Sequence, residues 1–313
     1  MKRMSRQLVG WIDDAVPLQT VRQSGMFRSI HFWLIPTLVV FLAIYGTIGW
    51  NFIISLTDFQ GITLPAYEVS NFDVETYVQL AEDPTFWRAL RNTVILMVVF
   101  PLACLSVGIF LAIIVDQKIR FENTFRTIYL LPFSLSFVVT AKFWLWMYNP
   151  EIGVINSILG YIGLDFLALN WLAPEYKLWA VMVALVWQFS GYTMVIYLAG
   201  LRKIPTAQYE AAKSDGASPL TVYLRIIIPQ LRASTVSAAI VLVVFSLKAF
   251  DFLYAMFRSF PGPTADILAT MMYREAFGSA NWAYGSAIAM VLFGLALVIV
   301  LPYLYTEYRR GAL

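Results

Sequence analysis

The sequence predicts an all-α membrane protein with six transmembrane helices. Of the 313 residues, 60% are hydrophobic and 13% are charged, and the mean hydropathy is +0.70. Soluble domains carry about 25% charged residues, so this composition is typical of a chain immersed in lipid. Apolar stretches long enough to cross about 30 Å of hydrocarbon as helix lie at residues 32–55, 93–115, 127–148, 177–200, 234–256 and 284–305.

The basic residues between these stretches are distributed unequally. If the N-terminus is cytoplasmic, fifteen Lys and Arg residues fall in cytoplasmic segments, and the outer side holds five, which are Arg88, Arg91, Lys177, Arg258 and Arg274. Basic residues of short loops are retained in the cytoplasm. We therefore expect both termini inside, with a cytoplasmic segment at 1–31 and a transmembrane domain at 32–313.

The residue inventory argues against a catalytic or metal site in this chain. One cysteine, Cys104, and one histidine, His31, are too few for a cysteine or multi-histidine metal centre. No lysine follows a glycine, so the chain lacks the Gly-Lys pair of a phosphate-binding P-loop. A membrane enzyme would need clustered His, Asp or Glu residues near an interface. We predict that this chain is not an enzyme and holds no cofactor.

The segment between the fourth and fifth stretches predicts a helix–turn–helix. A strong helix-forming run, Glu-Ala-Ala-Lys at 210–213, precedes Gly216, which can end the helix. Ser218 and Pro219 have the character of the cap and first residue of a second helix. Pro229 then closes that second helix.

This segment has the features of a docking surface for another protein. The small residues Ala211, Ala212 and Gly216 would let a partner backbone approach closely, and Glu210 would supply a charge. The alternative is an ordinary loop helix that only joins two spans.

The loop at 201–232 resembles the signature loop of binding-protein-dependent ABC import permeases. That signature is Glu-Ala-Ala, three residues, Gly, nine residues and Ile-x-Leu-Pro. In register with it stand Glu210, Ala211, Ala212, Gly216, Ile226 and Pro229, with Ile228 in place of Leu. The resemblance implies the type I ABC importer permease fold. It also implies that the loop couples the chain to a separate ATPase subunit by inserting into a cleft of it.

The resemblance narrows to carbohydrate permeases of the maltose and glycerol-phosphate type. Leu131-Pro132 and the run at 149–156 are similar to that group, and 262–264 reads Gly-Pro-Thr as in its first-permease subtype. Pro261 departs from that subtype, which has Gly there. The resemblance implies a multi-pass protein of the prokaryotic inner membrane that imports sugar.

The resemblance also implies a set of partners. They are a second homologous permease, two subunits that bind ATP and Mg, an extracytoplasmic solute-binding protein, the sugar and the lipid bilayer, with no nucleic acid. A non-sugar solute such as glycerol phosphate is an alternative. A secondary transporter would need corresponding broken spans in two halves, and no such symmetry is visible in the sequence.

Two segments mix aromatic and polar residues as sugar recognition requires, at 187–192 and 245–251. The family's sugar-lining positions correspond to Gln188 and Tyr192 in the fourth span and to Phe245 and Ser246 in the fifth. Lys248 and Asp251 lie three residues apart within a span, where charged groups face a cavity or one another. The alternatives are a structural ion pair and aromatic residues that face the core or the lipid. The predicted solute pathway is Gln188, Tyr192, Phe245, Ser246, Lys248 and Asp251.

Overall fold

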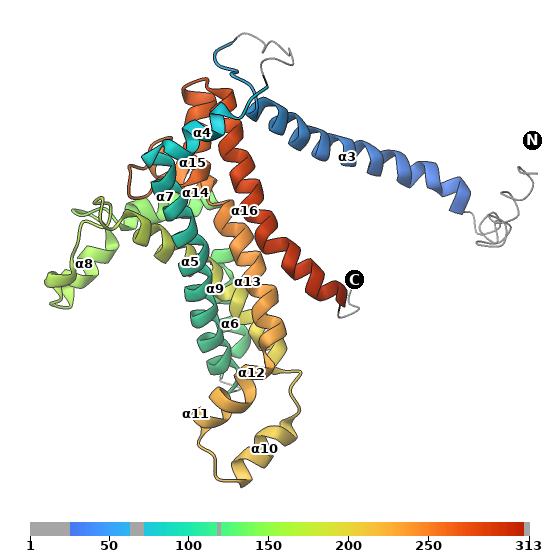
Figure 1. Ribbon diagram of the computed structural model, residues 1–313. Coiled ribbons are helices and arrows are strands. Elements are labelled where there is room, and N and C mark those ends of the chain that lie inside the picture. The colour runs from blue at the N-terminus through green and yellow to red at the C-terminus, as the bar shows by residue number, and fades with distance from the viewer. Residues whose placement is uncertain (1–25, 63–71, 118–119, 310–313) are drawn as a thin grey trace, which may run out of the picture. The chain divides into compact units, whose positions relative to one another are not determined.

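Every regular element is a helix in the residues that the computed structural model describes, which are 26–62, 72–117 and 120–309 (Figure 1). The all-α prediction is therefore confirmed for this part of the chain. The chain divides into two compact units, Met1–Ile53 and Ile54–Leu313. The predicted N-terminal segment 1–31 lies mostly outside the described residues.

The first unit contains most of helix α3, Met26–Ser55, which carries apolar side chains around its circumference. Its stretch Trp33–Ser55 is long and apolar enough to cross a membrane, with a mean hydropathy of 1.9 in an 18-residue window. The hydroxyls of Thr37 and Thr47 donate to carbonyl oxygens one turn earlier. These bonds pair the two threonine hydroxyls within the helix.

Helices α5 (Pro84–Asp116) and α9 (Lys177–Leu201) form the most extensive helix contact of the second unit. Gly108 of α5 lies against Thr193 of α9, where a Cβ atom at position 108 would overlap the threonine side chain. The Thr193 hydroxyl donates to the Cys104 carbonyl across the contact at 2.9 Å. Small residues and hydroxyls let helices approach closely in lipid, so this pair forms the centre of the bundle.

The third predicted span, 127–148, is bent, contrary to the expectation of a single helix. Two helices meet in it at an angle of 100°. Pro132 has no N–H to continue the first helix, and the Ser136 side chain caps the second by accepting a backbone N–H at 3.3 Å. The segments in order are α6, η2 and α7, at Glu122–Leu130, Pro132–Ser134 and Phe137–Met147.

The fifth predicted span, 234–256, is also interrupted. Helix α13 (Arg232–Leu247) ends before Lys248, and α14 (Phe250–Phe257) begins two residues later. Lys248 and Asp251 therefore do not share one continuous helical face. The described structure contains no ion pair between them, so it does not support the alternative of a structural ion pair.

Four described helices are long and apolar enough to cross a membrane alone, namely α3, α5, α9 and α16 (Trp282–Arg309). The number rises to six if α6 with α7 and the bent pair that contains α13 each count as one span. This count agrees with the six predicted spans. The shorter elements that precede or connect these spans are α4 (Glu75–Glu82), α8 (Val154–Tyr161), η3 (Asp165–Leu167), α15 (Leu268–Tyr273) and η5 (Arg274–Gly278).

Candidate coupling loop and solute pathway

Helix α10 (Thr206–Ser214) is the first arm of the loop between α9 and α13, and it ends in a Schellman turn. The N–H of Gly216 donates to the Lys213 carbonyl at 3.1 Å, and the N–H of Ala217 donates to the Ala212 carbonyl at 3.0 Å. Gly216 has a φ of +75°, a conformation that other residues adopt at a cost. The backbone of this turn therefore requires the glycine.

The second arm follows Ser218, which accepts the N–H of Thr221 at 3.3 Å and so caps the helix that Pro219 starts. Pro229 lies one residue before the end of this arm, and the chain then bends by 68° into α13. The predicted helix–turn–helix is thus confirmed. The arm consists of α11 (Pro219–Val222), the π turn η4 (Tyr223–Ile227) and α12 (Ile228–Gln230).

Side chains join the two arms to each other. The Gln230 amide donates to the Gln208 side-chain oxygen at 2.7 Å. The rings of Tyr209 and Tyr223 meet edge to face with centroids 6.2 Å apart. We call the two arms together the coupling loop (201–232). These contacts hold the two arms against each other.

The predicted coupling residues divide into exposed and buried positions. Glu210, Ala211, Gly216 and Pro229 are exposed. Ala212 is 5% exposed and belongs to the apolar cluster that the loop forms with α5 and α9. The Ala212 side chain is thus part of the internal packing of this chain, where a larger side chain would separate the arms.

The coupling loop is attached to two other elements of the bundle. The Tyr223 hydroxyl accepts the Gln117 amide N–H at 2.6 Å and donates to Asp116 at 3.3 Å, at the C-terminal end of α5. Arg202, which follows α9, forms an ion pair with Glu122 at the start of α6. A displacement of the loop therefore acts directly on the second and third spans.

Gln188, a predicted solute contact, is bound to the bend in the third span. It is 2% exposed, and its side-chain N–H donates at 2.8 Å to the Leu135 carbonyl, which lies between η2 and α7. Its side-chain oxygen is buried without a hydrogen-bond partner. The amide thus satisfies a backbone group that the bend leaves without a helical partner, and one acceptor remains available.

Tyr192 and Phe245 are brought together by an aromatic cluster. The Tyr192 ring stacks on Phe133 of η2, with centroids 5.0 Å apart and an interplanar angle of 18°. Phe189 lies 4.7 Å from Phe245 and also contacts Phe133 and Phe137. Sequence reasoning missed Phe133 and Phe137, because only the bend turns them toward α9; Pro132 inside an apolar stretch was the available signal.

The other predicted pathway residues are not joined to this cluster by any described hydrogen bond. Ser246 is buried, and its hydroxyl donates at 2.6 Å to the Val243 carbonyl of its own helix. Lys248 and Asp251 are exposed at the break after α13. In the described ranges, no group of three or more His, Cys, Asp or Glu residues gathers as a metal site would require.

Residues 105–310 match the family described as "Binding-protein-dependent transport system inner membrane component", including the whole coupling loop. The chain belongs to this family. It is accordingly a multi-pass membrane permease of an ABC importer, and the resemblance inferred from the loop is confirmed.

Two of three relatives of this permease are named for the sugars they transport. It is 49% identical over 309 residues to a xylose/arabinose import permease of Haloferax volcanii, covering 98% of this chain and 95% of that protein. It is 50% identical over 291 residues to a probable ABC transporter permease of Pyrococcus horikoshii, covering 92% and 99%. It is also 28% identical over 239 residues to a trehalose/maltose permease of Thermococcus litoralis, covering 76% and 80%.

Solved structures show the same fold. A bacterial ABC transporter that imports the acidic polysaccharide alginate has a chain 25% identical to this permease, with a TM-score of 0.73 and coverage of 93% and 98%. The alginate transporter in complex with a pentasaccharide-bound periplasmic protein matches with a TM-score of 0.76 at 24% identity, covering 93% and 96%. The importer fold is thus confirmed, and the cytoplasmic position of the termini stays a prediction.

Proposed function

We propose that this permease forms one half of the translocation pathway of an ATP-driven sugar importer. A second homologous permease completes the pathway, and an extracytoplasmic solute-binding protein delivers the sugar. Two separate ATPase subunits bind ATP and Mg and carry out hydrolysis, so this chain is not itself an enzyme. The sugar names of its relatives support the substrate class.

The geometry of the coupling loop carries this proposal. Glu210 and Ala211 are exposed on α10, the turn at Gly216 has a fixed backbone, and both arms are bound to one another. A surface that is rigid and attached to the spans can be moved as a body by closing ATPase subunits. Such movement would switch the pathway between inward and outward access.

The aromatic cluster supports the pathway assignment. Phe133 and Tyr192 stack nearly parallel, and exposed aromatic faces of this kind pack against the apolar face of a sugar ring. The unpartnered Gln188 oxygen is an acceptor for a hydroxyl. We assign sugar contact to Phe133, Gln188, Tyr192, Phe245 and Ser246, with Lys248 and Asp251 at the break of the fifth span.

A phosphate-bearing solute such as glycerol phosphate is the second candidate. Lys248 is exposed at the break of the fifth span and forms no ion pair in the described structure. A free ammonium group in a pathway would attract a phosphate. Competition of glycerol phosphate with sugar uptake, abolished in Lys248→Met, would favour this candidate.

Two glycines with the same backbone conformation provide the test of coupling. Gly216 and Gly163 have φ of +75° and +77°, and a Cβ atom at either would meet nothing within 4 Å. Asp at either position thus imposes a similar backbone strain, but only Gly216 is in the coupling loop. We expect Gly216→Asp to abolish co-purification of the ATPase subunit and ATP-driven uptake, and Gly163→Asp to retain ATPase binding.

Equal retention of the ATPase by both variants would contradict the docking role of the loop. The pathway assignment has its own test in Tyr192→Ala, which should impair sugar uptake and leave basal ATP hydrolysis intact. Unchanged uptake kinetics would remove Tyr192 from the pathway.

A further inference from the structure

Helix α5 is hydrogen-bonded to elements distant in sequence at two places, through its ninth and tenth residues, Asn92 and Thr93, and at its C-terminal end. Its 33 residues run without interruption past Pro101, and they span about 50 Å at a rise of 1.5 Å per residue. The inner end meets the coupling loop, and the outer end meets the segment that follows α14. One stiff helix therefore touches both regions.

At the outer end, α5 is bound to the backbone that precedes and begins α15. The Asn92 amide donates to the Pro263 carbonyl at 3.0 Å and to the Asp266 carbonyl at 2.8 Å. The Thr93 hydroxyl accepts the N–H of Leu268 at 2.9 Å. Asn92 and Thr93 are both buried, so these bonds are shielded from competing water and hold the two elements in one register.

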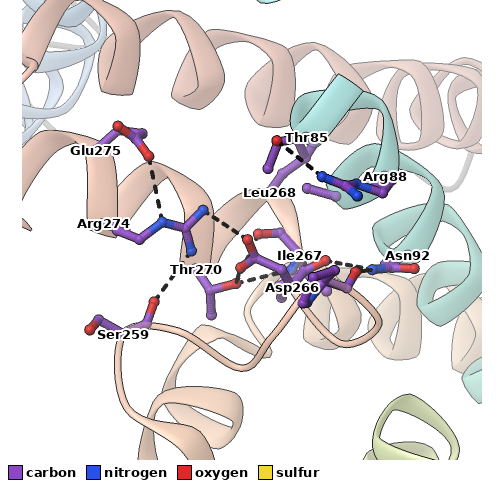
Figure 2. A network of polar contacts seen from close by, with 12 residues as sticks. Thr85, Arg88, Asn92, Ser259, Asp266, Ile267, Leu268, Thr270, Arg274 and Glu275 are labelled. Carbon is purple, nitrogen blue, oxygen red and sulfur yellow. Dashed lines mark hydrogen bonds and ion pairs between the residues drawn. The ribbon is translucent and has the colours of Figure 1, made fainter. Parts of the chain in front are cut away.

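The bound segment is itself made rigid by Asp266, as Figure 2 shows. This carboxylate is 2% exposed and accepts hydrogen bonds from Thr270 at 2.7 Å and from Arg274 at 2.8 Å. Arg274 also donates to the Ser259 carbonyl at 3.4 Å. Residues 259–274, which we call the outer platform, are thus fastened to one another and to α5.

At the inner end, α5 is bound to the second arm of the coupling loop. Asp116 is its last residue and Gln117 follows it, and both side chains bind the Tyr223 hydroxyl. Between its ends, α5 packs along α9. Because a packed helix does not shorten, its two ends cannot be displaced independently along the axis.

We propose that α5 is the rigid link through which the outer platform and the coupling loop sense one another. It transmits docking of the solute-binding protein at the outer face of the complex to the ATPase subunits, and transmits ATPase closure in the reverse direction. This inference rests on the proposed function, which supplies both partners. Coupling between two binding sites is reciprocal, so an alteration at either end changes the response at the other.

The test uses two variants that each remove one side-chain hydroxyl group. Tyr223→Phe removes both hydrogen bonds of the inner contact, and Thr93→Val removes one of the three of the outer contact with little change of shape. In the reconstituted complex, we expect each to reduce the ratio of ATP hydrolysis with the binding protein to ATP hydrolysis without it about fivefold. The double variant should lose no more than either single variant, because both interrupt one link.

Tyr197→Phe is the matched control. Tyr197 lies in the same apolar cluster as Tyr223, but its hydroxyl donates to Thr235 at 3.1 Å and so joins α9 to α13. We expect this variant to keep the stimulation of the wild type. An equal loss in the control, or additive losses in the double variant, would overturn the role of α5.

A long-range measurement keeps the inference testable even if Thr93→Val fails to assemble. Tyr223→Phe at the inner end should weaken binding of the solute-binding protein at the outer face about fivefold in the presence of a non-hydrolysable ATP analogue. If the Tyr223→Phe complex binds the solute-binding protein as tightly as the wild type, and the binding protein stimulates the wild-type complex, the rigid link is overturned and the proposed function stands. A wild-type complex that the binding protein does not stimulate contradicts the proposed function as well.

Discussion

Gly191 permits the contact between the third span and α9. A Cβ atom at this position would overlap the carbonyl oxygen of Tyr129 at the end of α6. The contact is between backbones, so it cannot be relieved by a change of rotamer. A single hydrogen atom as side chain therefore sets the distance between the two helices.

Gly191→Ala should destabilise the permease by about 1–3 kcal/mol, the usual range for overpacking. Thermal unfolding of the purified chain in detergent measures this loss. Gly46→Ala is the control, because a Cβ atom at Gly46 of α3 would meet nothing within 4 Å. Equal unfolding midpoints for the two variants would show that the backbones are not in contact.

Gln188→Leu should also destabilise the chain, by about 0.5–1.5 kcal/mol, since it removes the hydrogen bond to the Leu135 carbonyl. The measurement is again unfolding in detergent. Ser190→Ala serves as the control on the same helix, because the Ser190 hydroxyl bonds only to a carbonyl of its own turn, at 3.4 Å. Equal stabilities for Gln188→Leu and the wild type would remove Gln188 from the bend.

At the scale of elements, the two interrupted spans determine where the pathway residues lie. The bend of 100° between α6 and α7 places Phe133 on Tyr192. The break after α13 separates Lys248 from Asp251. Pro132 gave a local reason to expect the first interruption. No glycine or proline marks the break between α13 and α14, so the apolar run alone predicted one continuous helix at 234–256.

The N-terminus of α5 depends on Asp83 for its cap. Asp83 accepts the Thr85 N–H at 2.7 Å and the Tyr284 hydroxyl at 2.7 Å. Partial burial raises the pKa of this carboxyl, but the hydrogen bonds outweigh burial and hold the pKa below its usual value of 3.8. Asp83 thus stabilises the fold above about pH 4, and this contribution disappears as the pH falls through the lowered pKa.

We therefore expect Asp83→Asn to be less stable than the wild type near neutral pH, and the difference to narrow below about pH 4. Thermal midpoints in detergent between about pH 3 and pH 7 measure it. A difference that stays constant over this range would show that the ionised carboxylate is not the stabilising species.

At the scale of the whole molecule, the distribution of basic residues predicts the orientation in the membrane. Tyr161 in α8 is 93% exposed, and Lys213 in the coupling loop is also exposed. Cys104 is buried, so it gives little background in a labelling experiment. We expect an impermeant maleimide to label Tyr161→Cys on intact cells and Lys213→Cys only after permeabilisation. The reverse pattern would invert the topology.

The coupling loop is the part of the candidate site that the sequence predicted most completely. Its turn at Gly216 and its cap at Ser218 depend on residues within five positions of one another. Such local interactions are visible in a linear sequence. The burial of Ala212 inside this chain was not predicted. The residues that pack on a small side chain in an amphipathic helix come from other elements, which the local sequence does not show.

The sequence by itself determined that this chain is a helical membrane permease with the signature loop of its family, because hydropathy and the loop signature are local or compositional properties. Tertiary structure alone decided which residues meet across the bundle. Asn92 bonds to Asp266, 174 residues away, and Gln188 to Leu135, 53 residues away. Such bonds depend on where helices bend and cross, which is set by the packing of the whole chain and by no single segment.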